Sequence, residues 1–179
     1  MAALFGIGWF LAQFSQWQWL GPQATLSGVI GTGFALAALL FAALMTLARI
    51  PSLQTPGIKA VYRWSWKQYG QLGWPSIVLI ALLAGLAEEM LMRAGIQSNL
   101  NKWLPAELSI AITAVIFGLL HFINWVYVVA ATTIGLFIGI VFHQTESLVC
   151  VMVLHTTYDI LALGVIAKCP HWLNIDTQA

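Results

Sequence analysis

Long apolar segments without charge constrain the fold of this chain most strongly. The run Leu26–Ala48 holds about 23 residues and no charged side chain, and roughly 20 apolar residues in a helix cross a bilayer. These runs are continuous, whereas the strands of a barrel alternate in polarity, so they predict helices. The six segments of this kind are Ala2–Leu20, Leu26–Ala48, Trp74–Met92, Leu108–Phe122, Trp125–Phe142 and Leu148–Ala167.

Composition supports the same class. Hydrophobic residues make up 60% and charged residues 7% of the 179 residues, against about 25% charged residues in soluble domains. We predict an all-α, polytopic transmembrane helical bundle of five to six spans, with no room for a sizeable soluble domain. The net charge of +1 gives no reason to expect nucleic acid as a partner. The first segment is the weakest span because Gln13, Gln16 and Gln18 interrupt it.

The polar stretch between the second and third segments has two interpretations. Tyr62, Trp66 and Tyr69 alternate there with Arg63 and Lys67, as in an amphipathic helix that lies at the membrane interface. An ordinary connecting loop is the other interpretation, and the pattern favours neither.

Two smaller features concern the later segments. Gly95–Glu107 contains Asn99 and Lys102 and is expected to be a polar link. Gly135 and Gly139 have the spacing of small residues that let two membrane helices approach closely. We expect them to mark a packing face.

Six ionisable residues lie inside segments that otherwise have the composition of membrane spans. A charged side chain in hydrocarbon costs roughly 2.5–3.5 kcal/mol on insertion scales, yet three of the chain's six acids are placed there. We therefore expect an intramembrane polar site, and chemistry is the leading explanation for it. The six residues are Glu88, Glu89, Arg93, His121, His155 and Asp159.

The spacing of the two glutamates predicts different roles for them. Glu89 and Arg93 are four residues apart, so on a helix they share a face and can form an ion pair. Glu88 is turned about 100° away and need not share that partner. This division predicts a structural Glu89 and a reactive Glu88, which would serve as a general base that takes a proton from water.

The two histidines also have neighbours at helical spacing. His155 and Asp159 are four residues apart, as are Phe117 and His121. An imidazole and a carboxyl facing one point can hold a metal, fix a tautomer or stabilise developing negative charge. One intramembrane histidine alone is as easily a structural hydrogen-bonding group. Groups from three segments together favour a functional site, and no HExxH, GxSxG or glycine-rich phosphate loop is present to offer another.

Three motifs in this region resemble those of one protease family. Glu88–Arg93 (EEMLMR) resembles the EExxxR motif of the CAAX protease and bacteriocin-processing (CPBP, also called Abi) intramembrane proteases. Phe117–His121 (FGLLH) is similar to the family's FxxxH motif, and His155–Asp159 (HTTYD) to its third, a His followed four residues later by Asn or Asp. The resemblance covers residues 72–167. Residues 1–71 add N-terminal spans with a polar connection, and residues 168–179 a C-terminal tail, all within one membrane domain.

The resemblance implies an intramembrane endopeptidase that hydrolyses a peptide bond in or near the membrane. Glu88 would activate the water, and Glu89, Arg93 and Phe117 would shape the site. His121 would assist proton transfer or bind water, while His155 and Asp159 would steady the tetrahedral intermediate or hold a metal.

The same resemblance implies the partners and the location. The substrate would be a peptide or protein, prenylated or inserted in the membrane, and the surroundings would be membrane lipid. The compact loops indicate a multi-pass protein of a prokaryotic cell membrane.

The last motif residue bears on the cofactor. The family often has Asn where this chain has Asp159, and an ionised Asp only accepts hydrogen bonds. Metal ligation or orientation of a histidine therefore suits Asp159 better than oxyanion stabilisation. His121, His155 and Asp159 are the expected set for Zn²⁺, and a metal-free mechanism around Glu88 is the alternative.

Two questions stay open at this point. A non-enzymatic membrane protein, such as an ion- or proton-coupled transporter or an immunity or scaffold protein, would use the buried Glu–His set structurally. The membrane orientation is also open. The basic stretch Arg49–Lys67 belongs in the cytoplasm by the positive-inside rule, which then puts Glu88 nearer the opposite face. In the eukaryotic members of the family the site opens to the cytosol.

Overall fold

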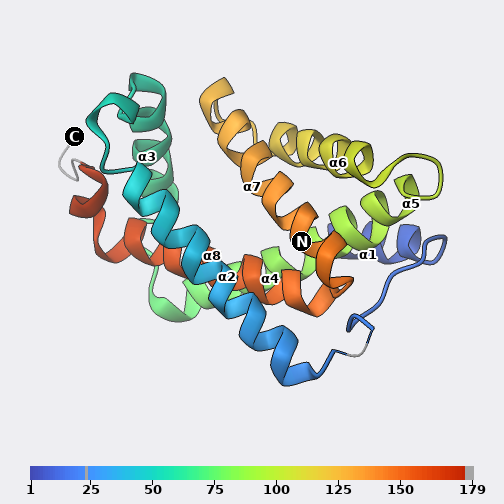
Figure 1. Ribbon diagram of the computed structural model, residues 1–179. Coiled ribbons are helices and arrows are strands. Elements are labelled where there is room, and N and C mark those ends of the chain that lie inside the picture. The colour runs from blue at the N-terminus through green and yellow to red at the C-terminus, as the bar shows by residue number, and fades with distance from the viewer. Residues whose placement is uncertain (23, 176–179) are drawn as a thin grey trace.

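The computed structural model describes residues 1–22 and 24–175, and all regular structure among them is helical. Figure 1 shows the helices crossing one another as a bundle, with α3 at one end of it. The elements are α1 (Ala2–Ala12), α2 (Leu26–Leu47), η1 (Pro51–Leu53), α3 (Pro56–Tyr69), α4 (Trp74–Glu89), the π-helical η2 (Met90–Gln97), α5 (Ser98–Leu100), α6 (Ala106–Leu120), α7 (Trp125–Thr145), α8 (Leu148–Lys168) and η3 (Pro170–Leu173). The predicted all-α class is confirmed.

Among the described residues, four helices are long and apolar enough to cross a membrane: α2, Trp74–Leu100, α7 and α8. Four of the predicted five to six spans are therefore confirmed as helices that are long and apolar enough to cross a membrane. The other two predicted segments form the shorter apolar helices α1 and α6.

The predicted segment Ala2–Leu20 is wrong as one continuous helix, because α1 ends at Ala12. Polar side chains that follow bond to the carbonyl groups at that end. Ser15 Oγ donates to the carbonyl of Ala12 at 3.1 Å and Trp17 Nε1 donates to the same oxygen at 3.1 Å. These contacts satisfy a carbonyl that the helix leaves free and turn the chain away from the helix axis.

The predicted polar link Gly95–Glu107 is wrong in its first part, because the helix that begins at Trp74 continues to Leu100. Its polar side chains bond within the protein. Asn99 Nδ2 donates to the carbonyl of Leu11 at 2.8 Å, and Ser98 Oγ donates to the carbonyl of Arg93 at 2.8 Å. The π-helical part, Met90–Gln97, is a widened turn of the kind frequent at functional sites.

The stretch before Trp74 forms an amphipathic helix from Pro56 to Tyr69, so the loop interpretation is wrong for these residues. The Thr55 hydroxyl accepts from the backbone N–H of Ile58, and Pro56 occupies the first turn, both of which favour a helix start. Val61 and Ser65 are buried, and α3 contacts α7 and α8.

Side-chain contacts gather several helix ends beside α3. Lys168 Nζ at the end of α8 donates to the carbonyl of Leu72, at 2.6 Å, just before α4. Asn124 Nδ2, before α7, donates to the carbonyl of Gly57 in α3 at 3.1 Å. We call this end of the bundle the α3 end. The last residues of α6 also lie at the α3 end, because α7 begins there and only residues 121–124 join α6 to α7.

Small residues let the helices that carry the site approach closely. The predicted packing face on α7 is confirmed. A Cβ at Gly135 would lie 3.2 Å from the Phe117 ring and 3.3 Å from Cα of Ala114. Such a contact is tighter than side chains usually make, so α6 and α7 depend on glycine there to keep their spacing.

Candidate active site

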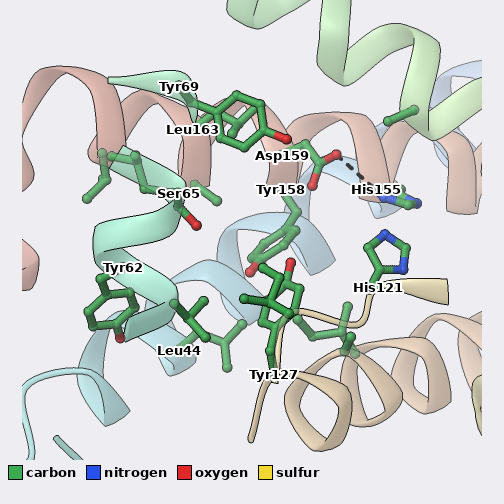
Figure 2. A pocket seen from close by; sticks show the side chains of 18 of the residues that line it. Leu44, Tyr62, Ser65, Tyr69, His121, Tyr127, His155, Tyr158, Asp159 and Leu163 are labelled. Carbon is green, nitrogen blue, oxygen red and sulfur yellow. Dashed lines mark ion pairs between the residues drawn. The ribbon is translucent and has the colours of Figure 1, made fainter. Parts of the chain in front are cut away.

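Four of the six predicted ionisable residues meet at one place. Glu88 Oε2 lies 3.5 Å from Nε2 of His121 and 3.9 Å from Nε2 of His155. His155 Nε2 also lies 3.5 Å from Oδ2 of Asp159, the pair joined by a dashed line in Figure 2. Because these residues come from α4, α8 and the end of α6, their convergence is a product of the tertiary fold.

Each imidazole is fixed through its Nδ1 atom. His121 Nδ1 lies 2.8 Å from the carbonyl oxygen of Phe117, and His155 Nδ1 lies 2.6 Å from Oε1 of Glu89. Both partners accept hydrogen bonds, so each Nδ1 is assigned the proton. The Nε2 atoms are left to face Glu88.

Glu89 and Arg93 form the predicted ion pair, at 2.9 Å between Nε and Oε2. Both side chains are 0% exposed. The second carboxylate oxygen of Glu89 is the partner of His155. Glu89 thus links the arginine to the site histidine, and its structural role stays a prediction.

Gln97 extends this network and was missed by the sequence analysis. Its Oε1 accepts from Arg93 Nη1 at 3.1 Å, and its Nε2 donates to the carbonyl of Gly139 at 3.1 Å. Arg93 Nη2 also donates to the carbonyl of Gly135, at 3.3 Å. A buried chain of polar contacts therefore runs from His155 to the backbone of α7. The four-residue step from Arg93 to Gln97 was the available signal, hidden because the segment was ended at Met92.

Glu88 differs from its neighbour. Its Oε2 atom is buried and has no hydrogen-bond partner among the described residues, although its side chain keeps 13% exposure. A buried carboxylate oxygen without a donor is costly. It is therefore the atom of this site best placed to accept a proton or a hydrogen bond from a bound molecule.

A cavity of about 480 Å³ opens beside these residues. All four tyrosines of the chain line it, and Figure 2 shows Tyr62, Tyr69, Tyr127 and Tyr158 around it with Ser65 of α3. Apolar side chains of α2 and α8 form much of the remaining wall. The sequence analysis considered Tyr62 and Tyr69 only as residues of an interfacial helix or a connecting loop, and it gave Tyr127 and Tyr158 no role in the site.

The tyrosine of α3 nearest the acids stays a hydrogen-bond donor. Burial raises the pKa of Tyr69, and the carboxylates of Asp159 and Glu88 raise this pKa further. A protonated phenol in this cavity can donate to a substrate oxygen.

The predicted zinc ligands were tested against this geometry. Anchoring of Nδ1 by a carbonyl or carboxylate, as in His121 and His155, is typical of metal-binding histidines. Over residues 1–22 and 24–175, however, no group of three or more His, Cys, Asp or Glu side chains is arranged to hold a metal ion. The two histidines and Asp159 do not form such a group among the described residues. Binding of Zn²⁺ stays an untested prediction, and no step below uses it.

Comparison with known proteins gives one family and one relative. The family described as type II CAAX prenyl endopeptidase Rce1-like matches residues 70–161, a range that includes every predicted site residue. "Uncharacterized protein YpbD" of Bacillus subtilis (strain 168) is 30% identical over 88 residues, which are 48% of this chain and 42% of that protein. The chain thus spans less than half of the length of this relative. No solved structure matches the chain.

Proposed function

Because the chain belongs to the Rce1-like family of type II CAAX prenyl endopeptidases, we propose that it is a membrane-embedded endopeptidase in which Glu88 activates the attacking water. One observation carries this assignment. Glu88 Oε2 is buried without a hydrogen-bond partner among the described residues and faces Nε2 of two histidines. A water held between such groups can give one proton to the carboxylate.

The proposed steps use the positions of these groups. Water donates one hydrogen to Glu88 Oε2 and the other to Nε2 of His121, which turns a lone pair towards the substrate carbonyl. As the oxygen bonds to the carbonyl carbon, Glu88 takes the proton and the carbonyl oxygen becomes negative. The C–N bond then breaks while Glu88 returns the proton to the leaving nitrogen, so the carboxylate is regenerated.

His155 is placed to stabilise the negative oxygen. Its two ring nitrogens face the carboxylates of Glu89 and Asp159 at 2.6 and 3.5 Å, and a ring that carries a proton on each nitrogen can donate in both directions. The Nε2–H group would then donate to the oxyanion. Asp159, as an acceptor, orients this ring, and the cavity phenols supply further donors.

The substrate and the location belong to the same proposal. Four helices suited to spanning and a largely apolar cavity wall fit a peptide or protein that reaches the site from the bilayer, prenylated or inserted in the membrane. We assign the enzyme to a prokaryotic cell membrane.

Cleavage in cells tests the function without a known substrate. New peptide N-termini would be compared across the proteome of cells that express the wild type, Glu88→Gln, or Glu107→Gln at matched levels. Glu107 is an exposed acid at the start of α6 and serves as the control. We expect a discrete set of termini in the wild type and the control that is lost in Glu88→Gln. The same termini in all three would contradict the proposal and favour a non-enzymatic membrane role.

A further inference from the structure

The basic residues of the chain gather at the α3 end. Five of the seven Lys and Arg residues lie there, while the acids Glu88 and Asp159 line the cavity beside α3. Of the other two, Arg93 is buried in its ion pair and Lys102 lies at the opposite end. The five are Arg49, Lys59, Arg63, Lys67 and Lys168.

Three of these residues form a stripe along α3. Lys59, Arg63 and Lys67 are spaced four residues apart and are all exposed, so their side chains follow one face of the helix. None of the three takes part in an ion pair or side-chain hydrogen bond within the described part of the chain. Like charges at this spacing repel one another, and anions from outside the protein would relieve this repulsion.

Another face of the same helix forms part of the cavity wall. Tyr62, Ser65 and Tyr69 line the cavity that holds Glu88, and Figure 2 shows them on the α3 ribbon beside it. Trp64, next to Arg63, is 41% exposed. A helix with Lys and Arg on one face and aromatic residues beside them is typical of the membrane surface. Whatever binds the stripe therefore acts on a wall of the cavity.

We infer that the Lys59–Arg63–Lys67 stripe binds anionic phospholipid headgroups of the cytoplasmic leaflet and that this contact holds α3 in place as a wall of the cavity. Basic residues flanking spans face the cytoplasm, whose leaflet carries the anionic lipids. The α3 end is then cytoplasmic. The binding of phospholipid and the placement of α3 do not depend on the proposed function. Only the statement that the cavity is a reaction site rests on it.

This orientation agrees with the length of the helix that carries Glu88. In the sequence analysis this segment ended at Met92, which placed Glu88 close to the face opposite the α3 end. The helix runs from Trp74 to Leu100, so Glu88 lies about 21 Å from its start and about 18 Å from its end. The residue is therefore near mid-span, and its cavity reaches the α3 end through α3 itself.

Hydrogen exchange of α3 in lipid nanodiscs tests the inference. The full chain would be placed in discs of phosphatidylcholine alone, or of phosphatidylcholine and phosphatidylglycerol in equal parts. The variants are Lys59→Gln/Arg63→Gln/Lys67→Gln, the charge-preserving Lys59→Arg/Lys67→Arg, and Lys102→Gln as the control from the opposite end. Phospholipid retained in detergent would be counted as a second readout.

We expect phosphatidylglycerol to slow exchange of the α3 amide groups in the wild type, in the charge-preserving variant and in the control, but not in the triple variant. In the triple variant, preference for retained phosphatidylglycerol should fall about fivefold for each of the charges removed from the stripe. Unchanged exchange of wild-type α3 between the two lipids would overturn the inference even if the triple variant failed to fold. Equal protection by inorganic phosphate in phosphatidylcholine discs would also overturn it. Neither readout needs peptidase activity, so failure of the cleavage experiment leaves them unaffected.

Discussion

Glu88 and Glu89 are neighbours in the chain with opposite surroundings. Glu89 is fully buried and bonds Arg93 with one oxygen and His155 with the other. Glu88 keeps some exposure to the cavity, and its Oε2 atom has no hydrogen-bond partner among the described residues. One turn of helix thus holds a carboxylate satisfied by the protein and a carboxylate left for a bound molecule. In the proposed function, the fully hydrogen-bonded glutamate is the structural group and the other glutamate is the reactive one.

The largest expected effect comes from substitution of Glu88, the proposed reactive residue of the two. Glu88→Gln removes the base but keeps the size of the side chain, so cleavage should fall by about 10²–10⁴-fold. The thermal midpoint should stay near that of the wild type, because the lost oxygen had no partner in the described structure. Cleavage would be measured on a peptide taken from the cellular N-termini. Full turnover by this variant would remove Glu88 from the mechanism.

On the structural side, Arg93→Met leaves the buried Glu89 with His155 as its remaining partner. Loss of one member of a buried ion pair costs about 3–5 kcal/mol in the free energy of unfolding. Reversible unfolding in mixed micelles would measure the loss, with the exposed Arg49→Met, outside the α3 stripe, as the matched control. A change below about 0.5 kcal/mol, ordinary for surface substitutions, would show that the pair adds nothing to the fold.

Gln97→Leu should have a smaller effect on the same side. Arg93 and the carbonyl of Gly139 each lose a buried hydrogen-bond partner, which costs about 1–3 kcal/mol. The exposed Gln144→Leu, on α7, is the control for the same change of side chain. Equal stability of the two variants would place Gln97 outside the network.

The smallest expected effect concerns the cavity. Tyr69→Phe removes one hydroxyl donor and keeps the ring in place, so we expect a several-fold loss of cleavage with unchanged stability. Loss of one donor to a neutral acceptor corresponds to about 1 kcal/mol. Steady-state rates would be compared with those of Trp103→Phe, which alters an exposed aromatic side chain that does not line the cavity. Identical rates would show that Tyr69 forms part of the cavity wall and that its hydroxyl group donates no hydrogen bond to the substrate.

The local parts of the site were predictable from the sequence, because they depend on helical spacing. Four-residue steps placed Glu89 on Arg93 and His155 beside Asp159, and both pairs are present. The apolar runs likewise located α2, α7 and α8 to within a few residues.

Features that depend on contacts between distant segments were missed. The helix through Arg93 continues past Gly95 because the Asn99 side chain donates to a carbonyl group of α1. The sequence around Asn99 does not reveal that this distant carbonyl group is its partner. Gln97 was assigned to a polar link for the same reason. The tyrosines of the cavity lie on three helices, and only the packing of α3 against α7 and α8 brings them together.

The most direct test of the two roles is the free energy of unfolding of Glu88→Gln and Glu89→Gln, measured side by side in the same mixed micelles. We predict that Glu88→Gln unfolds within about 0.5 kcal/mol of the wild type. Glu89→Gln should lose about 3–5 kcal/mol, because it leaves Arg93 without its buried counter-charge. Equal losses in the two variants would contradict the division of the neighbouring glutamates into a reactive and a structural residue.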